Sequence, residues 1–416
     1  MALSLKGRNV LGLNGLGRIG KLSLWYHLHR RHFDGIVINT GREVGESLEH
    51  ICDVIATDST YGPLSRFLQG VGGQRDLQVV DEAEGLLAIH GLPVKILRRA
   101  RNPKDIGWRA EGVRLVVDTT GVFGDPTVPA DDPKGSLRGH LEAGARKVLN
   151  SAPFKIKDKA KKTPDDAAML IFGINHTRFD PGRHHVLSAA SCTTTGLAHM
   201  MKPLLEAEET SRILTASMST IHAATNTQSV LDSVPKAGAT DRRKTRAALG
   251  NIILSTTGAA KALEQVLPEI QQVGFMADSV RIPTQTVSLI NLNVTFHSWL
   301  DEKGDPAVSR AFINDLYRKA SEGSQKDLLV FTERQNVSAD MLGLPAAVVI
   351  EGHDNHTRTG FVELPADLLR LQGIECDKPV RMPVTHAKLF GWYDNEYGSY
   401  THCLGELTVY VDKSLG

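Results

Sequence analysis

Apolar runs and helix-spaced apolar positions alternate along the first part of the chain. Residues 8–14 have the pattern of a buried strand, a glycine-rich turn follows at 15–20, and residues 22–28 carry the apolar side chains of a helix. A second buried strand is expected at 35–40. A strand, a helix and a second strand within about 30 residues predict a βαβ unit, which builds parallel sheets.

The later pattern predicts two different sheets. Alternating helical segments and apolar runs favour an open α/β sheet up to about residue 190. After that point the strands become longer and alternate between apolar and polar positions, which favours a mixed, largely antiparallel sheet. The ranges are 113–119, 147–151, 168–174 and 184–189 for the first sheet, and 213–224 and 280–296 for the second.

Three stretches have the composition of surface insertions. Residues 124–139 contain three prolines, residues 155–166 contain five lysines, and a long segment spans 342–385. The lysine run is expected to be a solvated loop; the alternative is a patch for an anionic partner.

Composition and charge exclude several classes of protein. The chain has 416 residues, 41% hydrophobic and 23% charged, with a net charge of +1. These values favour a compact protein and argue against disorder and against a generic nucleic-acid binder, which needs a positive field. Four cysteines without a C-x-x-C pair indicate neither a disulfide framework nor a metal site. The chain shows no apolar signal core and no run of about 20 apolar residues, so we expect a cytoplasmic protein without a membrane partner.

Residues 15–20 match G-x-G-x-x-G, with a strand before the motif and a helix after it. Gly15 permits the tight turn, Gly17 lets the backbone approach a pyrophosphate, and Gly20 allows close packing of helix on strand. An ordinary glycine turn is the alternative. The context favours dinucleotide binding.

The end of the second strand bears on the choice of cofactor. An acidic residue that accepts bonds from the adenosine ribose is usual about 20 residues past the last glycine, but Thr40 stands there. Arg42 follows and could bind a 2′-phosphate, which favours NADP. Alternatively, Arg42 points to solvent and Glu43 accepts the ribose bonds of NAD.

Cys192 is expected in the first turn of a helix, because a strand precedes it and helix-spaced apolar residues follow. There the helix dipole stabilises a thiolate, which is the reactive form. His222 lies where an alternating strand gives way to a polar loop and could pair with that thiolate. Arg281 and the hydroxyl-rich helix start at 255–260 are the kinds of group that bind phosphate in proteins. Each could equally be a surface charge or a helix cap.

Taken together, these motifs resemble the phosphorylating glyceraldehyde-3-phosphate dehydrogenase family. The resemblance runs in the family's order over nearly the whole chain, apart from the insertions. It rests on Asn14–Gly20, Thr120–Phe123, Ser151–Pro153, Ser188–Thr194, Thr220–Ala223, Asn251–Ile253, Ser255–Lys261, Arg281–Thr284 and Trp392–Glu396. It implies a Rossmann-type dinucleotide-binding domain at 1–190, a catalytic domain at 191–396, and a C-terminal helix at about 397–416 that packs back on the first domain.

The resemblance also implies roles for single residues. Cys192 attacks the aldehyde of glyceraldehyde 3-phosphate, His222 is the base, and inorganic phosphate cleaves the thioester to give 1,3-bisphosphoglycerate. Residues matched to the two phosphate sites are Ser191, Thr193, Thr225, Thr257, Gly258 and Arg281. Residues matched to the cofactor site are Gly15, Gly17, Arg18, Ile19, Gly20, Thr40, Arg42, Thr120, Ser151 and Asn395. A homotetramer is implied as well.

The chain departs from the family pattern at several points. The aspartate after the second strand is absent, and Ser233 stands where members that prefer NAD carry a leucine; both departures favour NADP or dual use. Ser399 replaces a tyrosine near the nicotinamide, and 342–385 lacks the family's His-Ser-Ser sequence. Two alternatives stay open: an erythrose-4-phosphate dehydrogenase, and an inactive nucleotide-binding interaction protein of the same fold.

Overall fold

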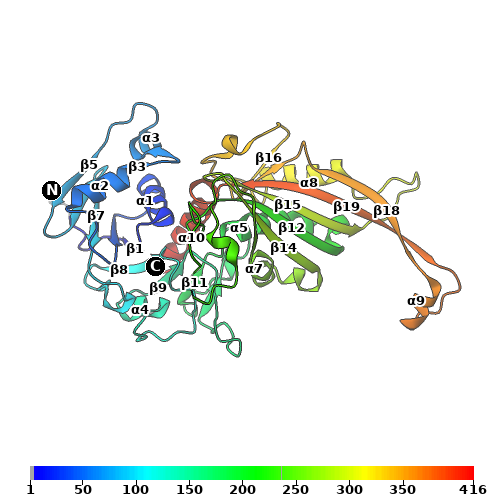
Figure 1. The fold of residues 1–416 in the computed structure, drawn as a ribbon, viewed down its shortest axis with the longest axis horizontal. Coiled ribbons are helices and arrows are strands. Elements are labelled where there is room, and N and C mark those ends of the chain that lie inside the picture. The colour runs from blue at the N-terminus through cyan, green and yellow to red at the C-terminus, as the bar shows by residue number, and fades with distance from the viewer. Residues whose placement is uncertain (1–3, 236) are drawn as a thin grey trace. The chain divides into compact units, whose positions relative to one another are not determined.

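The computed structural model describes residues 4–235 and 237–416. Its chain forms two compact units, one made of Met1–Cys192 with Glu396–Gly416 and the other of Thr193–Asn395 (Figure 1). The division falls inside the helix that begins at Cys192, so the cysteine belongs to the first unit.

The described residues of the first unit form a nine-stranded sheet in the order β10-β11-β9-β8-β1-β2-β7-β6-β5. The strands from β10 to β7 are parallel, and β6 and β5 add an antiparallel edge. Their bounds are β1 Val10–Asn14, β2 Gly35–Asn39, β5 Leu77–Asp81, β6 Leu86–Ile89, β7 Leu92–Leu97, β8 Val113–Asp118, β9 Lys147–Asn150, β10 Ala167–Met169 and β11 Val186–Ser188. A small hairpin pairs β3 Thr57–Asp58 with β4 Gly62–Pro63.

Helices cover both faces of this sheet. The apolar side of α1 (Arg18–Arg30) packs with α10 (His402–Lys413) in one core that includes Leu11 of β1 and Ile36 of β2. In another cluster, Leu137 of α4 (Leu137–Glu142) packs with Val148 of β9. The other α-helices are α2 Leu48–Ala56 and α3 Leu64–Gln69, and a π-helical turn at Tyr397–Thr401 leads into α10.

The described residues of the second unit form an eight-stranded mixed sheet in the order β13-β14-β12-β15-β19-β17-β16, with β18 paired to β19. On β15, buried and half-buried residues alternate along the whole strand because one face lies on the core. The strands are β12 Ile213–Ala223, β13 Ile253–Thr256, β14 Gly274–Ile282, β15 Ser288–His297, β16 Leu329–Thr332, β17 Val348–Glu351, β18 His356–Leu364 and β19 Val380–Tyr393. The helices are α5 Cys192–Glu206, α6 Glu208–Ser211, α7 Ala259–Val266, α8 Arg310–Glu322 and α9 Ala366–Leu371. The predicted α/β fold with a second, mixed sheet is confirmed.

Two predicted strands were wrong in extent. The range 280–296 is two strands, because Pro283 lacks the N–H that a ladder needs and Val287 adopts a left-handed backbone with φ of 65°. The range 168–174 ends as a strand at Met169. Beyond it, the side chain of Asn175 bonds the backbone of Met169 and Ile171 and turns the chain.

The predicted insertions at 124–139 and 342–385 were wrong in part. The first ends in α4, whose first residue Leu137 is fully buried. The second contains β17, a buried strand of the sheet, followed by β18, α9 and the start of β19. Only the lysine-rich stretch 155–166 is a largely exposed loop.

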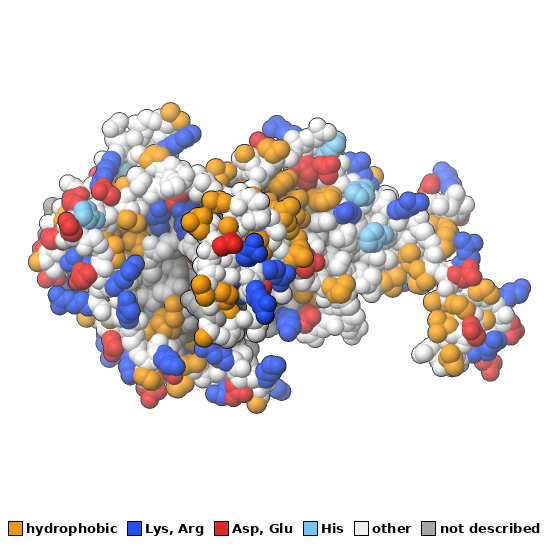
Figure 2. Space-filling model, in the orientation of Figure 1, with side chains coloured by type: hydrophobic (Ala, Val, Ile, Leu, Met, Phe, Trp, Pro, Cys, Tyr) orange, Lys and Arg blue, Asp and Glu red, His pale blue; other side chains and the backbone are white. Residues whose placement is uncertain are grey.

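An arm extends from the second sheet. Residues 384–393 of β19 pair with β15, whereas residues 380–383 pair with β18 and no longer with β15, so this hairpin continues past the sheet with α9 at its tip (Figure 1). Hydrophobic side chains are visible among charged ones on the arm (Figure 2). Those exposed include Phe361, Val362, Leu368, Leu371, Ile374 and Val380.

Candidate functional site

The glycine turn between β1 and α1 has the geometry that its sequence requires. Gly15 adopts φ of 104°, which favours glycine. A Cβ on Gly20 would lie 2.2 Å from the carbonyl oxygen of Gly15, so only glycine lets α1 approach β1 this closely. A Cβ on Gly17, the N-cap of α1, would meet nothing within 4 Å. The turn is thus closed on the protein side and open at the helix start, where a pyrophosphate binds in such folds.

Arg18 begins α1, but its side chain is engaged within the first unit. The guanidinium forms ion pairs with Asp58 and with Glu396, and Lys21 lies 2.8 Å from the same Asp58 carboxylate. Burial alone would raise the pKa of Asp58, yet hydrogen bonds from Lys21 and Arg18 outweigh it and lower the pKa to about 2. The Arg18 guanidinium is therefore already paired with two carboxylates of the protein. Contact of residues 18 and 19 with a pyrophosphate, predicted from the sequence, would then use their backbone.

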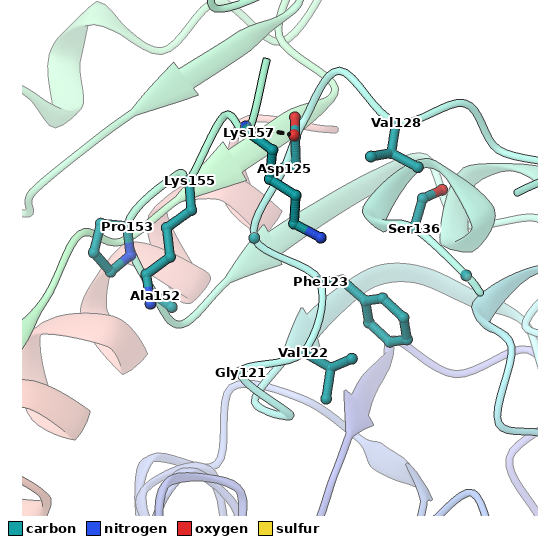
Figure 3. A pocket seen from close by; sticks show the side chains of 12 residues that line it. Gly121, Val122, Phe123, Asp125, Val128, Ser136, Ala152, Pro153, Lys155 and Lys157 are labelled. Carbon is teal, nitrogen blue, oxygen red and sulfur yellow. Dashed lines mark hydrogen bonds between the residues drawn. The ribbon is translucent and has the colours of Figure 1, made fainter. Parts of the chain in front are cut away.

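Thr120 and Ser151 follow the last residues of β8 and β9. The loops that carry them frame a cavity of about 120 Å³ lined by Phe123, Ser136, Lys155 and other residues of both loops (Figure 3). The backbone N–H of Lys157 donates to Asp125 at 3.0 Å and ties the two loops together. The predicted insertions 124–139 and 155–166 therefore meet beside the predicted cofactor residues.

The loops after β2 and β7 place several arginines together. The Thr40 hydroxyl donates to the backbone oxygen of Arg42, and a side chain at Gly41 would come within 3.6 Å of Arg101. Glu43, the alternative ribose ligand, lies 3.5 Å from Arg98. Sequence reasoning missed residues 98–101, although the run Arg-Arg-Ala-Arg after an apolar strand was a visible signal. It was missed because β7 is next to β2 only in the folded sheet.

Cys192 is the first residue of α5, as predicted. Ala190 before it has a left-handed backbone with φ of 55°, which turns the chain sharply from β11 into the helix. Two bonds hold this turn: the Ser188 hydroxyl accepts from the N–H of Ala190 at 3.1 Å, and the Tyr400 hydroxyl donates to its carbonyl oxygen at 3.2 Å. Burial raises the pKa of Tyr400 well above its usual value, so the donor stays protonated.

His222 and Arg281 are neighbours because β12 and β14 pair in parallel with these two residues in register. The Arg281 guanidinium contacts Nδ1 of His222 and donates to the carbonyl oxygen of Ala223 at 3.3 Å. Burial, with a smaller effect from the Arg281 charge, lowers the pKa of His222 to about 4. The imidazole is therefore neutral at neutral pH and can accept a proton.

Hydrogen bonds orient the Asn395 side chain toward one ring nitrogen of His222. Ser288 accepts from the N–H of Ala223 and donates its hydroxyl proton to Oδ1 of Asn395, so the Asn395 amide turns its Nδ2 to Nε2 of His222 at 3.2 Å. Nδ1 lies 2.7 Å from the carbonyl oxygen of Ala223 and also contacts the Arg281 guanidinium, whereas Nε2 faces the Asn395 amide. The second unit thus brings together His222, Arg281 and Asn395.

The residues matched to phosphate sites lie in varied settings. Thr193 is buried, and its hydroxyl bonds the hydroxyl of Tyr393 at 2.8 Å. Gly258 is the N-cap of α7, and the Thr257 hydroxyl accepts from the N–H of Ala259 at 3.2 Å. Thr225 bonds Thr227 in the exposed loop after β12. Ser191 directly precedes α5 and is half-buried.

These features define the class of protein: an oxidoreductase with a dinucleotide-binding sheet and a cysteine at a helix start. Family models match its two parts, namely the NAD binding domain of glyceraldehyde 3-phosphate dehydrogenase at residues 9–126 and the C-terminal domain at 191–366. The chain belongs to the glyceraldehyde-3-phosphate dehydrogenase family. The family and enzyme class predicted from the sequence are confirmed.

Relatives align over nearly their whole length. Glyceraldehyde-3-phosphate dehydrogenase of Streptomyces coelicolor is 32% identical over 97% of this chain and 99% of that protein. The Chlamydomonas reinhardtii protein named glyceraldehyde-3-phosphate dehydrogenase, cytosolic, is 30% identical over 98% of each chain. The Geobacillus stearothermophilus enzyme is 31% identical over 96% of this chain and 97% of its own. Within the described residues, no helix is long and apolar enough to cross a bilayer.

Substitutions at two glycines should separate folding from binding. Gly17→Ala adds a methyl group in open space, so its melting temperature should stay within a few degrees of the parent's while affinity for NAD or NADP falls by about tenfold or more. Gly20→Ala should lower both the melting temperature and the cofactor affinity, because the methyl group would collide with Gly15. Thermal unfolding and calorimetric titration with each cofactor test this. Full cofactor affinity in Gly17→Ala would contradict the role of the turn.

The pKa of His222 should depend on Arg281. Arg281→Ala removes a nearby positive charge, so the pKa should rise from about 4 toward the ordinary value of 6.5, without reaching it because burial remains. NMR titration of the imidazole in parent and variant measures the shift. Arg246→Ala, which removes an exposed arginine paired with Asp232, is the control. An unchanged His222 pKa in Arg281→Ala would show that the two charges do not interact.

Proposed function

We propose that the chain catalyses the reversible, NAD(P)-dependent oxidation of glyceraldehyde 3-phosphate with inorganic phosphate, giving 1,3-bisphosphoglycerate. The observation that carries the proposal is the position of Cys192 at the start of a 15-residue helix, directly after the left-handed turn at Ala190. A thiol there lies on the positive end of the helix dipole, which favours the nucleophilic thiolate. Membership of the family supports the substrate.

The chain's own residues account for the steps on the substrate. The Cys192 sulfur attacks the aldehyde carbon and forms a thiohemiacetal, and Nε2 of His222 takes the proton of its hydroxyl group. A nicotinamide dinucleotide supplies the hydride acceptor when bound, and the Gly15–Gly20 turn fits its pyrophosphate because Gly17 leaves open space. Cys192 then carries the acyl group as a thioester. An oxygen of inorganic phosphate attacks the thioester carbonyl carbon, and the thiolate leaves.

Arg281 is proposed to bind the terminal phosphate of the substrate. It is half-buried, it lies against His222, and a guanidinium can bind phosphate through paired hydrogen bonds. The same charge adds to the larger effect of burial in lowering the pKa of His222, so the imidazole is neutral before the reaction. An anion bound at Arg281 would offset that charge and make the imidazole a stronger base when substrate is present.

We infer that NADP is used at least as well as NAD. No carboxylate stands at Thr40, and Arg42, Arg99 and Arg101 are exposed on neighbouring loops without an ion-pair partner among the described residues. Glu43 is close to Arg98, which reduces its competition for the ribose. A 2′-phosphate at this edge would meet positive charge rather than repulsion.

The assembly and the compartment are further proposals. We infer a homotetramer, supported by the family resemblance, and a cytoplasmic location, supported by the name of the Chlamydomonas reinhardtii relative. Light scattering should give a mass about four times the 45.3 kDa of one chain. A stable monomer would contradict the tetramer.

Loss of Cys192 should abolish turnover, whereas loss of His222 should slow it. Cys192→Ala should bind cofactor and release no acyl phosphate. His222→Asn should slow hydride transfer by about 10² to 10⁴ with an unchanged cofactor Kd, because it removes a base and leaves the first unit intact. Cys376→Ala, which removes a half-buried thiol of the second unit, is the control. Steady-state and single-turnover rates measure these effects.

The parent's need for phosphate discriminates between the open alternatives. Turnover should require inorganic phosphate, because phosphate cleaves the thioester. Turnover that is fast without phosphate, and faster on erythrose 4-phosphate, would instead indicate a hydrolytic dehydrogenase. Cofactor binding without turnover on either substrate would indicate an inactive interaction protein.

Cofactor choice should depend on the arginine loops. Arg101→Ala should lower kcat/KM for NADP by about tenfold and leave the value for NAD unchanged, because only NADP has a phosphate to lose. Thr40→Asp should shift preference toward NAD through repulsion. Arg183→Ala, an exposed arginine near Asp165, is the control. A parent that strongly prefers NAD would contradict the inference.

A further inference from the structure

A buried carboxylate lies at the carboxyl end of β8 and accepts hydrogen bonds on both oxygens. Asp118 is fully buried. Its Oδ1 accepts from the N–H and the hydroxyl of Thr120 at 3.0 and 2.6 Å. Its Oδ2 accepts from Nδ2 of Asn14 at 2.7 Å and from Nε2 of His140 at 3.0 Å. Four donors therefore replace the water that a carboxylate would otherwise bind.

The protonation of His140 follows from its second partner. The indole N–H of Trp108 donates to Nδ1 of His140 at 2.9 Å, and an indole can only donate. Nδ1 is therefore an acceptor, the ring is neutral, and its proton is on Nε2, facing Asp118. Both side chains are fully buried, as is Asp118. Trp108 thus orients the donor that His140 offers to the carboxylate.

The bonds continue from β8 across β1 to β2. Asp118, Asn14 and Asn39 are the last residues of these adjacent parallel strands and lie opposite one another in register. Oδ1 of Asn14 accepts from Nδ2 of Asn39 at 2.9 Å. Asn39 in turn accepts from the N–H of Gly41 at 3.3 Å and donates to the carbonyl oxygen of Ala100 at 3.0 Å.

One buried network therefore joins the glycine turn to the loops that carry Thr120, Arg42 and Arg101. Asp118 holds the Thr120 loop, Asn14 ends the strand that enters the glycine turn, and Asn39 holds the two arginine loops. None of the three network side chains is exposed enough to contact a ligand, since each is at most 3% exposed. Their effect on a cofactor must pass through the loops that they hold.

We propose that Asp118, His140 and Asn14 are positioning residues for the cofactor, and that the network sets the spacing between the glycine turn and the loop of Thr120. The inference rests on the proposed function of the first unit as a dinucleotide site. It assigns to Asp118 and His140 a role that neither the glycine motif nor the cysteine motif contains. Their loss should weaken cofactor binding without changing the chemistry of Cys192.

The test uses Asp118→Asn, which keeps size and removes the charge. If the oxygen of the new amide keeps its bonds to Thr120, the amide nitrogen faces Nδ2 of Asn14 and Nε2 of His140. Both of these atoms are donors as well, so the two hydrogen bonds on this side are lost. Calorimetric titration of the full chain with NAD and with NADP should give Kd values about ten- to a hundredfold higher than those of the parent. KM for cofactor should rise in the same ratio, while KM for glyceraldehyde 3-phosphate and cofactor-free alkylation of Cys192 stay within about twofold.

A second substitution tests the tautomer. Trp108→Phe frees Nδ1 of His140, so that in Asp118→Asn the ring can move its proton to Nδ1 and accept from the new amide at Nε2. The double variant should regain part of the lost cofactor affinity, whereas Trp108→Phe alone should bind cofactor as the parent does. No regain would contradict the orientation that we assign to His140.

Val148→Ala is the matched control for stability. It shortens a fully buried side chain on β9, next to β8, outside the network. It should lower the melting temperature and leave both Kd values unchanged. Equal losses of affinity in Val148→Ala and Asp118→Asn, or parental affinity in Asp118→Asn, would overturn the proposal. A parent that binds neither NAD nor NADP would instead contradict the proposed function itself.

Discussion

The structure of the first unit depends on polar side chains at the ends of buried parallel strands. The apolar strands end at the carboxyl edge of the sheet. In the loops that follow, buried backbone N–H and C=O groups need hydrogen-bond partners that the sheet no longer supplies. Four strands solve this in one way: their last residue bonds the backbone two positions later, as Asn39 does with Gly41, Asp118 with Thr120, Asn150 with Ala152, and Ser188 with Ala190. The same bonds therefore shape the predicted cofactor edge and the turn that leads into Cys192.

The second unit contains the proposed base, His222, whose charge state depends on its surroundings. Burial lowers the pKa of His222, and the Arg281 cation, which lies beside it in the register of β12 and β14, adds a smaller effect in the same direction. A neutral imidazole is suited to accept a proton. The sequence suggests that His222 pairs with the Cys192 thiolate, but a neutral imidazole cannot form an ion pair with it. We infer that the thiolate is stabilised chiefly by the start of α5, and that His222 acts when the substrate hydroxyl group must lose its proton.

Local signals in the sequence were sufficient for much of the fold and for part of the site. The glycine turn and the helix start at Cys192 were predictable because strand, turn and helix are contiguous. The contact of His222 with Arg281 was not, because 59 residues separate them and only strand register brings them together. The partners of Asp118 were missed for the same reason, although a carboxylate that ends an apolar strand is a signal worth following. The segment 342–385 was misjudged because β17 has only four residues and reads as part of a loop.

The proposed reaction depends above all on Cys192 carrying the acyl group between hydride transfer and phosphate attack. Mass spectrometry of the full chain, quenched after one turnover with glyceraldehyde 3-phosphate and cofactor but without inorganic phosphate, tests this most directly. We expect one equivalent of reduced cofactor per active chain and an acyl adduct that maps to Cys192 and disappears when phosphate is added. Reduced cofactor formed without an adduct on Cys192, or an adduct that phosphate does not remove, would contradict the proposed role of this cysteine.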